Sequence, residues 1–367
     1  MNKLGFGFLR LPVFQEANGE EIDLALLNQM VDTYISSGKK YFDTAYTYLD
    51  GKSEWAIRES VVKRYPRNSF ILADKLPGYL LTSHKMCYQY FQEQLQRCQV
   101  NYFDVYLLHW LNEKNYQIAE KYQEFEFLQE MKASGKVIKT GFSYHDSAEL
   151  LDEILTAHPE VDYVQLQINY LDWESEAIQS RRCYEIAEKH RKKVIVMEPV
   201  KGGTLANPSE EAKKILQELS AEASPASFAI RFAESLPNVE VVLSGMNTMG
   251  QLLDNLQEHK PVDEREKQML MKAAAIINCS TVVPCTGCGY CLSGCPKHIC
   301  IPDYFKLYNE YSRNPQDDWK IMPIYQRLTM EHGKPEECIG CKKCESLCPQ
   351  KLSVTEYLLK VKECFYE

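Results

Sequence analysis

Two short runs concentrate most of the cysteine in this chain of 367 residues. Eight of its 14 cysteines lie in "CTGCGYCLSGCP" (285–296) and "CIGCKKCESLCP" (338–349). In each run three cysteines stand three residues apart, and a fourth follows four residues later, directly before a proline. Thiolates at this interval can wrap one face of an iron–sulfur cube while glycines let the backbone curl close. The other six cysteines are scattered, and we expect them to be small buried apolar residues.

The repeated spacing resembles the cluster-binding signature of bacterial ferredoxins. In that signature the fourth cysteine of each run serves the other cluster, so the resemblance implies two [4Fe–4S] clusters. The implied ligand sets are Cys285, Cys288, Cys291 and Cys348 for one cluster, and Cys338, Cys341, Cys344 and Cys295 for the other. Zinc is the alternative metal, but its paired C-x2-C knuckles need neither the third cysteine nor the Cys-Pro that follows.

The two cysteine runs also begin a longer internal repeat. The segments "CPKHICIPDYF" and "CPQKLSVTEYL" align so that three apolar or aromatic positions correspond: Ile299 with Leu352, Ile301 with Val354, and Tyr304 with Tyr357. The repeat predicts that each half has one ligand loop and one apolar segment that packs over the clusters.

A second group of reactive side chains lies in the first third of the chain. Asp43, Lys75 and His109 each close a short apolar run, and Tyr48 follows Asp43 by five residues. If the runs are neighbouring strands, Asp43 can pair with Lys75, and a nearby cation favours the phenolate form of tyrosine. His109 can hydrogen-bond a substrate oxygen. Such a set could give a proton to a carbonyl oxygen while hydride reaches the carbon.

The pattern of the whole chain up to about residue 260 indicates which elements position these side chains. Eight apolar runs alternate with amphipathic stretches: "LGFGFL", "KYFDTA", "FILADKL", "FDVYLLH", "IKTGFS", "YVQLQI", "VIVMEP" and "VEVVLSG". Strands that are each followed by a helix predict an α/β fold, a (β/α)8 TIM barrel, whose strand ends share one face. An open doubly wound sheet is the alternative, but "LGFGFLRLP" lacks the third glycine of its G-x-G-x-x-G turn.

The segments "FDTAYTY", "ADK" and "LLHW" resemble the Asp, Tyr, Lys and His tetrad of the aldo-keto reductase superfamily. The resemblance covers residues 4 to about 260 and implies a barrel that binds an extended nicotinamide cofactor, NADPH or NADH. It further implies that Tyr48 is the general acid, that Lys75 and Asp43 tune it, and that His109 positions the carbonyl. The substrate would be a small carbonyl compound or alcohol.

The resemblance and the strand ends together suggest cofactor contacts, which are Ser143, Gln167, Lys201, Gly202, Ser244, Gly245, Asn247, Gln251 and Asn255. Two departures from the family pattern stand out. Met197 occupies the place where many members have an aromatic ring, and residues 244–259 contain no lysine or arginine. Because a 2′-phosphate needs a cationic partner, NADH could serve as well as NADPH, with Lys201 the one nearby basic candidate.

These patterns predict two domains, an aldo-keto reductase-type barrel over 1–262 and a ferredoxin-type domain over 263–367. The helical pattern "DEREKQMLMKAAAIIN" (263–278) would connect them, and residues 308–328 should form a loop and a helix. A net charge of −9 disfavours nucleic-acid binding, and no apolar run approaches the roughly 18 residues of a membrane span. The N-terminal "MNKLGFGFLRLP" lacks the features of a signal peptide, so a cytoplasmic location is expected.

Three functions are compatible with the sequence. The first is an NAD(P)H-linked oxidoreductase that interconverts a carbonyl and an alcohol and carries two clusters. The second is an electron-transfer protein that links a ferredoxin-like redox partner to the barrel, although no flavin motif is present to convert single electrons into hydride. In the third, the clusters are purely structural. Candidates for the substrate pocket are Phe8, Arg10, Trp110 and Tyr144.

Overall fold

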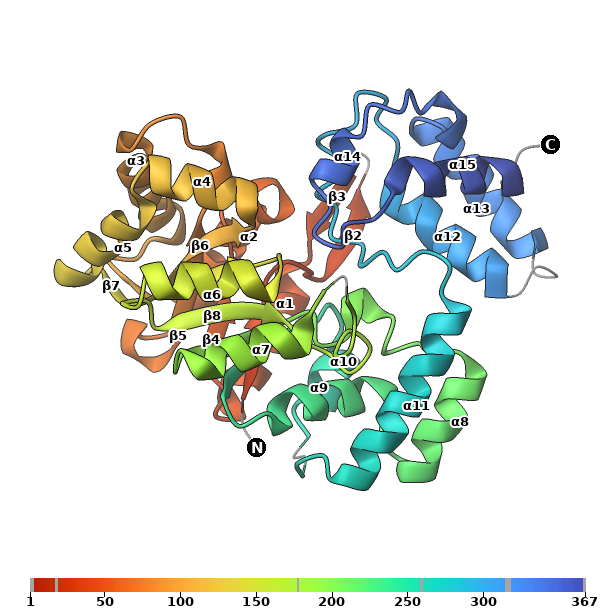
Figure 1. The fold of residues 1–367 in the computed structure, drawn as a ribbon, viewed down its shortest axis with the longest axis horizontal. Helices are drawn as coiled ribbons and strands as arrows, with labels where there is room; N and C mark the ends of the chain where they lie inside the picture. The colour runs from red at the N-terminus through yellow and green to blue at the C-terminus, as the bar shows by residue number, and fades with distance from the viewer. Residues whose placement is uncertain (1–2, 17–18, 177, 258–259, 314–317, 366–367) are drawn as a thin grey trace. The chain divides into compact units, whose positions relative to one another are not determined.

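The computed structural model describes residues 3–16, 19–176, 178–257, 260–313 and 318–365. The chain divides into two compact units (Figure 1). We call Met1–Pro199 with Ala226–Lys267 the barrel unit, and Val200–Pro225 with Gln268–Glu367 the cysteine unit. The second unit therefore includes a segment, Val200–Pro225, that no pattern in the sequence groups with the cysteines.

Eight parallel strands close into a barrel in the order β1-β10-β9-β8-β7-β6-β5-β4. Their bounds are β1 Leu4–Gly7, β4 Tyr41–Asp43, β5 Ile71–Leu76, β6 Phe103–Leu111, β7 Val137–Tyr144, β8 Tyr163–Gln167, β9 Lys193–Met197 and β10 Val239–Gly245. Each strand lies within or overlaps one of the eight predicted runs, so the predicted barrel is confirmed.

Helices follow the strands around the barrel: α1 Leu24–Ser36, α2 Lys52–Ile57, α3 Lys85–Cys98, α4 Glu113–Lys121, α5 Glu124–Ala133, α6 Ala148–Ala157, α7 Ser180–Lys189, α9 Pro225–Ser235 and α10 Met249–Asn255. Several begin at a side chain that caps the first turn; Asp23, Asn112 and Ser147 each accept a hydrogen bond from a backbone N–H three residues on. None of the described helices combines the length and the apolar character that crossing a membrane requires.

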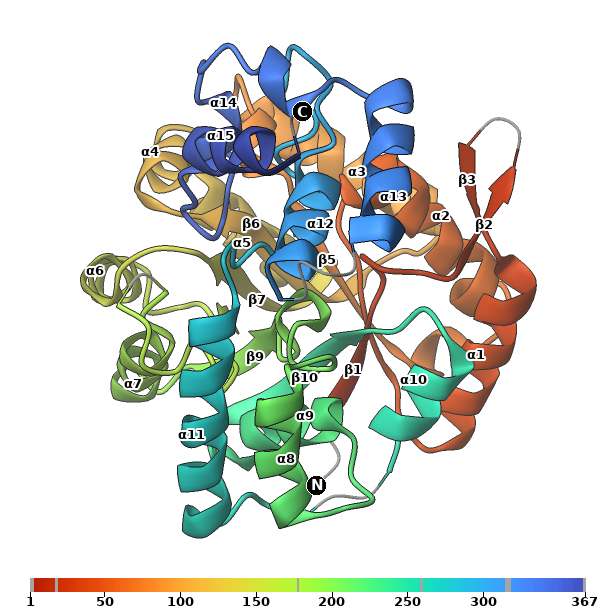
Figure 2. The same ribbon diagram turned by 90° about the vertical axis from the view of Figure 1, so that its right-hand side faces the viewer.

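A small hairpin precedes α1 and was not predicted. Its strands are β2 Val13–Glu16 and β3 Gly19–Ile22, paired antiparallel, and Figure 2 shows them as a separate two-stranded ribbon. Val13 and Phe14 are exposed, so the hairpin lacks the buried face that makes a strand recognisable in a sequence.

Alternate residues of the strands fill the barrel interior. One layer contains Tyr41, Ala73, Val105, Leu107, Tyr163, Ile195, Val241 and Leu243, all buried. Since side chains of a strand alternate between its two faces, the next inward positions on β4, β5 and β6 are Asp43, Lys75 and His109. The apolar layer thus forms the floor beneath these three polar side chains.

The cysteine unit is mainly helical. It contains α8 Glu210–Leu219, most of α11 Glu264–Ser280, and α12 Ile301–Arg313, α13 Asp318–Glu331, α14 Lys343–Ser346 and α15 Val354–Phe365. The predicted helix over 263–278 corresponds to α11, and the segment 308–328 contains the end of α12 and most of α13.

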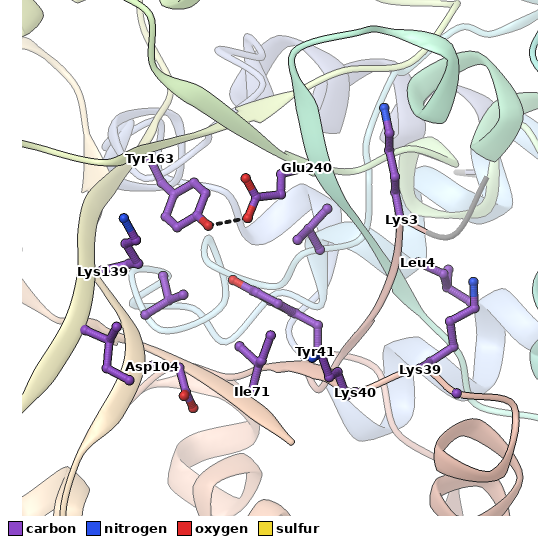
Figure 3. Close-up of a pocket in the computed structure, with 14 residues that line it drawn as sticks. Lys3, Leu4, Lys39, Lys40, Tyr41, Ile71, Asp104, Lys139, Tyr163 and Glu240 are labelled. Atoms are coloured by element: carbon purple, nitrogen blue, oxygen red, sulfur yellow. Dashed lines mark hydrogen bonds between the residues drawn. The ribbon is translucent and has the colours of Figure 1, made fainter. Parts of the chain in front are cut away.

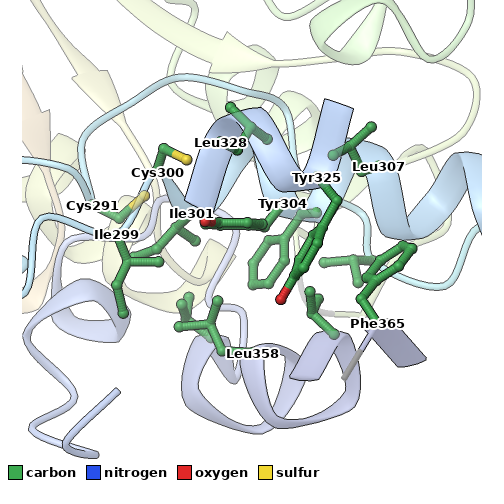
Figure 4. Close-up of a cluster of buried hydrophobic side chains, with 14 of the residues drawn as sticks. Cys291, Ile299, Cys300, Ile301, Tyr304, Leu307, Tyr325, Leu328, Leu358 and Phe365 are labelled. Atoms are coloured by element: carbon green, nitrogen blue, oxygen red, sulfur yellow. The ribbon is translucent and has the colours of Figure 1, made fainter. Parts of the chain in front are cut away.

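The two halves of the cysteine unit follow the predicted repeat. Ile301 begins α12 and its counterpart Val354 begins α15, and both are about 1% exposed. The rings of Phe305 on α12 and Tyr357 on α15 meet edge to face, 5.9 Å apart. Figure 4 shows part of the shared apolar core, in which Cys291 lies beside Ile299 and Ile301. Each ligand loop is therefore followed by a helix that contributes to one core.

Candidate active site and candidate cluster sites

Asp43 and Lys75 form a buried ion pair at the C-terminal ends of β4 and β5. Lys75 Nζ lies 2.6 Å from Asp43 Oδ1 and donates a second hydrogen bond, 2.7 Å long, to the carbonyl oxygen of Thr44. The Lys75 side chain is 1% exposed and that of Asp43 4%. The two contacts fix the ammonium at the barrel mouth, as the sequence predicted from neighbouring strand ends.

Tyr48 and His109 complete the group. Tyr48 lies in the loop after β4, and Lys75 Nζ is 4.8 Å from the centre of its ring. The rings of Tyr48 and His109 meet edge to face with centres 5.7 Å apart. The structure therefore brings all four predicted tetrad residues together on one end of the barrel. Tyr79, which the sequence analysis did not single out, packs against His109 at 5.8 Å.

A bulge in β6 sets the direction of His109. Between Leu108 and Leu111 the pairing of β6 with β7 slips by one residue. Trp110 has a left-handed backbone with φ of 65°, and its N–H donates to Ser143 Oγ at 2.7 Å. Bulges of this kind re-aim side chains beside functional sites. A strained backbone next to His109 is consistent with such a site.

Burial and the ammonium of Lys75 control the charges in the group. Burial raises the pKa of Asp43, and the nearby Lys75 opposes that rise. Burial lowers the pKa of His109 well below its ordinary value, and Lys75 and His145 add to the effect. His109 is therefore neutral near pH 7, and a neutral imidazole can donate one N–H to a carbonyl oxygen.

Two of the predicted nicotinamide contacts are also buried at strand ends. Ser143 near the end of β7 accepts the N–H of Trp110. Gln167 ends β8, and its Nε2 donates to Asp172 Oδ2 at 2.8 Å. Asn169 Nδ2 donates to the same carboxylate oxygen and to the carbonyl of Glu198. Asp172, which the sequence analysis missed, thus orients the amide of Gln167.

The predicted phosphate-binding segment, residues 244–255, is held in shape by its own side chains. Asn255 Nδ2 donates to Ser244 Oγ at 2.9 Å, and the backbone N–H of Asn247 donates to Gln251 Oε1 at 2.8 Å. Gly245 is the last residue of β10. Ser244 and Gly245 end β10, Asn247 lies in the loop that follows, and Gln251 and Asn255 belong to α10, so the predicted segment runs from a strand end through a loop into a helix.

The aliphatic part of an arginine side chain lies beside this segment, which itself contains no lysine or arginine. A methyl group built on Gly245 would lie 3.2 Å from Cβ of Arg10. Arg10 also pairs with Glu198, NH2 to Oε1, at 3.2 Å. From the sequence, Arg10 was a candidate only for the substrate pocket, because it lies 235 positions before Gly245 in the chain.

Lys201 and Gly202 lie in the cysteine unit. They belong to a short 3-10 helix, η5 Lys201–Gly203, that follows β9. Lys201 is 4% exposed, and its Nζ donates to Gln350 Oε1 at 3.1 Å. Of the predicted cofactor contacts, these two are the ones that the structure groups with the cysteines.

The predicted cluster ligands gather in two neighbourhoods. Burial raises the pKa of Cys291, and the thiols of Cys288, Cys285, Cys348 and, with the smallest effect, Cys344 add to that rise. Burial also raises the pKa of Cys344 to about 11, with Cys338 as its contributing thiol. The fourth cysteine of the second run thus lies near the first run, as interleaved ligand sets require.

Backbone groups of the ligand loops also suit an anionic cluster. Gly287 and Gly340 hold equivalent places in the two runs, and both have a φ of 66°. This left-handed backbone favours glycine. The N–H of Gly287 donates to Cys285 Sγ at 3.4 Å. N–H donors to sulfur are a means by which proteins bind and tune iron–sulfur clusters, so the residues fit the predicted group.

The sulfur positions do not suit a single metal ion. A tetrahedral zinc ion has Zn–S bonds of about 2.3 Å, which would put its sulfur ligands about 4 Å apart. Among the described residues, which include all eight cysteines of the two runs, no three cysteine sulfurs lie within 4.8 Å of one another. A larger cluster is the better fit to these loops.

A cavity of about 390 Å³ opens at the other end of the barrel unit. Figure 3 shows Tyr41, Tyr163 and Glu240 inside it, with Tyr163 donating to Glu240, and Lys3 and Lys139 around them. Its lining comes from the N-terminal ends of the strands and includes none of the predicted site residues. In this fold, chemistry occurs at the opposite face.

Comparison with known families agrees with this geometry. Residues 3–274 match the model of the aldo/keto reductase family, and residues 284–352 match that of the 4Fe-4S dicluster domain. The chain therefore belongs to the aldo/keto reductase family. It is an oxidoreductase of that family that carries a C-terminal 4Fe-4S dicluster domain, as the sequence analysis predicted.

Individual relatives resemble the two parts separately. An aldo-keto reductase from Bacillus halodurans, in its holo form, has a TM-score of 0.60 and 22% identity over 74% of this chain and 91% of its own. An aldo/keto reductase from Klebsiella pneumoniae, solved with NADP and acetate, has a TM-score of 0.56 and 17% identity over 74% of this chain and 90% of its own. At these identities the likeness shows the fold. Ferredoxin-3 from Nostoc sp. is 30% identical over 66 residues, which are 18% of this chain and 63% of that protein.

Proposed function

We propose that this protein interconverts a small carbonyl compound and its alcohol by hydride transfer with a nicotinamide cofactor. The observation that carries the proposal is the buried group at the barrel mouth, in which Lys75 lies 2.6 Å from Asp43 and 4.8 Å from the ring centre of Tyr48. A phenol next to a fixed ammonium and a neutral imidazole is suited to exchanging a proton with a substrate oxygen.

Each of the four side chains would have a distinct role in the reaction. The neutral imidazole of His109 orients the substrate oxygen, and the hydroxyl of Tyr48 gives that oxygen its proton during reduction. The charge of Lys75 stabilises the phenolate that remains, and Asp43 fixes Lys75 in place. In the oxidation direction the same phenolate takes the proton from the alcohol.

A reduced nicotinamide, when bound, supplies the hydride that reaches the carbonyl carbon. Ser143 and the Asp172-oriented Gln167 are the candidates to hold its carboxamide, and the loop 244–255 is the candidate for its pyrophosphate. NADPH is the better candidate, because Arg10 lies beside Gly245 and could bind a 2′-phosphate. The Klebsiella pneumoniae relative solved with NADP supports this choice.

In the cysteine unit we propose two [4Fe–4S] clusters with interleaved ligands. Cys285, Cys288, Cys291 and Cys348 would hold one, which we call cluster I. Cys338, Cys341, Cys344 and Cys295 would hold the other, which we call cluster II. The grouping of Cys348 with Cys285, Cys288 and Cys291 supports this assignment. Such clusters suit a reducing, cytoplasmic setting and could exchange electrons with a redox protein partner.

Replacing Tyr48 tests the proposed acid. In anaerobically prepared protein, Tyr48→Phe should lower kcat for aldehyde reduction at least about 100-fold, as expected for loss of a general acid, while NADPH binding measured by fluorescence stays the same. Tyr46→Phe is the matched control, since Tyr46 lies two residues earlier and its hydroxyl donates to Glu93 instead. Equal activity of Tyr48→Phe and Tyr46→Phe would exclude Tyr48 as the acid.

The electron-transfer alternative makes a different prediction. If single electrons from the clusters drive the barrel, a reduced viologen should support substrate reduction without NAD(P)H. We expect no such turnover, because hydride moves two electrons together and the clusters pass one at a time.

A further inference from the structure

Lys201 is a buried cation within the cysteine unit. It is 4% exposed, and its Nζ donates to the side-chain oxygen of Gln350 at 3.1 Å. Gln350 is itself 6% exposed and follows Cys348, a proposed ligand of cluster I, by two residues. A lysine is almost never buried to this degree unless its charge has a use or a partner. The hydrogen bond therefore places the charged side chain of Lys201 against the loop that contains Cys348.

Gly202, the next residue, brings the same segment into contact with the other loop that would hold cluster I. Gly202 has a φ of 61°, and a Cβ built on it would lie 2.2 Å from the carbonyl oxygen of Thr286. Only glycine allows so close an approach of two backbones. Thr286 follows Cys285, another proposed ligand of cluster I. Lys201 and Gly202 thus contact two chain segments, 285–286 and 348–350, that would meet at one cluster.

Gln350 also faces Cys348 through its backbone. Burial raises the pKa of Cys348, and the backbone N–H groups of Leu352, Gln350 and Lys351 lower it against that rise. Lys201 holds the side chain of Gln350, so it helps to fix a residue whose backbone lies beside that thiol. Hydrogen bonds to ligand sulfurs and nearby charges are two of the factors that set the reduction potential of an iron–sulfur cluster.

We propose that Lys201 is a positioning residue for cluster I and raises its reduction potential. Reduction adds one negative charge to the cluster, and a fixed cation away from water stabilises the reduced form more than the oxidised form. The bond to Gln350 acts in the same direction by holding a backbone N–H beside Cys348. This inference rests on the proposed cluster assignment and gives Lys201 a role other than binding the cofactor.

Lys351 provides a natural comparison. It is exposed, although it follows Cys348 by only three residues, one more than Gln350 does. Water screens a charge at the surface, so its side chain should affect the cluster much less than that of Lys201. Comparing variants of the two lysines therefore distinguishes the effect of a buried charge from that of any charge near the loop.

The test is an anaerobic redox titration of the full-length protein, followed by electron paramagnetic resonance. Lys201→Met removes the charge, Lys201→Arg keeps it, and Gln350→Glu supplies a negative partner of similar size. In Lys201→Met and Gln350→Glu we expect the same one of the two couples to shift to lower potential, by about tenfold in its equilibrium constant, or about 59 mV. In Lys201→Arg and Lys351→Gln that couple should stay within a third of this shift.

The outcomes distinguish a failure of the role of Lys201 from a failure of the cluster assignment on which it rests. If the wild-type protein shows no cluster signals, the cluster assignment itself fails. If Lys201→Met binds iron normally and titrates like the wild type, the role of Lys201 is excluded. If Lys201→Met does not assemble its clusters, Gln350→Glu decides, and an unchanged potential in that variant overturns the inference. An equal shift in Lys351→Gln would also overturn it, because burial would then be irrelevant.

Discussion

Lys75 is the residue that connects the other members of the barrel site. Its ammonium contacts Asp43 Oδ1 and the carbonyl of Thr44, and it lies 4.8 Å from the ring centre of Tyr48. Only 1% of its side chain is exposed, so water cannot replace these contacts. Removing one partner of such a pair leaves an uncompensated charge in the interior, which is more costly than the pair itself.

A double-mutant comparison separates the structural and chemical roles of this pair. Lys75→Met should lower the free energy of unfolding by about 3–5 kcal/mol, because Asp43 is left buried without its cation. Adding Asp43→Asn should restore much of that stability, while kcat stays at least about 100-fold below wild type. Urea unfolding and steady-state kinetics give the two readouts. Recovery of activity in the double variant would mean that Lys75 acts only in folding.

At the residue scale, the sequence was informative where chemistry depends on strand order. Asp43, Lys75 and His109 close consecutive strands, and consecutive strands of a parallel barrel are neighbours, so their proximity follows from the pattern. Arg10 was considered only for the substrate pocket, and Asp172 was missed, because the positions of both depend on loop conformations. No periodic pattern in the sequence relates Arg10 to Gly245.

Several short turns around the site have a left-handed backbone or contain a buried carboxyl group. Trp110 has a left-handed backbone at the β6 bulge, and Leu49 and Asp50 have one directly after Tyr48. A third feature is the start of α5, where Glu124 is 1% exposed and packs over Gly78, in the loop after β5. Burial raises the pKa of Glu124 to about 8, and the thiol of Cys87 lies close enough to be affected by it.

Glu124 should make the stability of the barrel depend on pH. Its pKa of about 8 in the folded protein exceeds the ordinary value of 4.5, so it contributes stability below pH 4.5 that is lost as the pH rises through 8. The full loss corresponds to about 5 kcal/mol at about 1.4 kcal/mol per pKa unit. In Glu124→Gln this decline should be absent, so the melting temperature of the variant should gain on that of the wild type between pH 5 and pH 8.

Glu126 supplies the control for this comparison. It lies on the same helix two residues later and is exposed. Glu126→Gln should keep the pH dependence of the wild type, since folding does not take this exposed side chain out of water. A constant difference in melting temperature between Glu124→Gln and wild type would reflect packing alone and would contradict a titration of Glu124 in this range.

At the element scale, the eight barrel strands could be predicted because burial on both faces makes them apolar and β-branched. The β2–β3 hairpin has exposed side chains and gave no such signal. The membership of Val200–Pro225 in the cysteine unit was also hidden, because it depends on contacts such as that of Lys201 with Gln350, 149 residues apart. The domain boundary proposed after residue 262 stays a prediction from the sequence.

The whole molecule combines an aldo/keto reductase barrel with a 4Fe-4S dicluster domain. The cysteine repeat predicted the second part in detail, since Ile301 and Val354 occupy equivalent places both in the sequence and at the starts of α12 and α15. Spacing identifies ligands because a cluster dictates where the chain must place sulfur.

Cysteine substitutions test how the clusters share their ligands. Cys348→Ala, Cys288→Ala and Cys341→Ala should each lower the iron content of anaerobically reconstituted protein by roughly half, by loss of one of two clusters. If the ligands interleave, Cys348→Ala and Cys288→Ala should lose the same paramagnetic signal and Cys341→Ala the other.

Cys300→Ala is the control for those variants. Cys300 is buried, lies outside both ligand sets and should retain full iron content. Loss of the same signal in Cys348→Ala and Cys341→Ala would instead show that each run binds its own cluster, contrary to the proposed ligand sets.

A deuterium label on the cofactor tests the proposed hydride transfer most directly. Aldehydes from a panel of small carbonyl compounds are reduced anaerobically in ordinary water with NADPH carrying deuterium on the transferable position of the nicotinamide ring. Mass spectrometry and NMR then locate the label in the alcohol. The proposed mechanism predicts one deuterium on the former carbonyl carbon and solvent hydrogen on the oxygen. An alcohol whose new carbon-bound hydrogen came from water would contradict hydride transfer in this barrel.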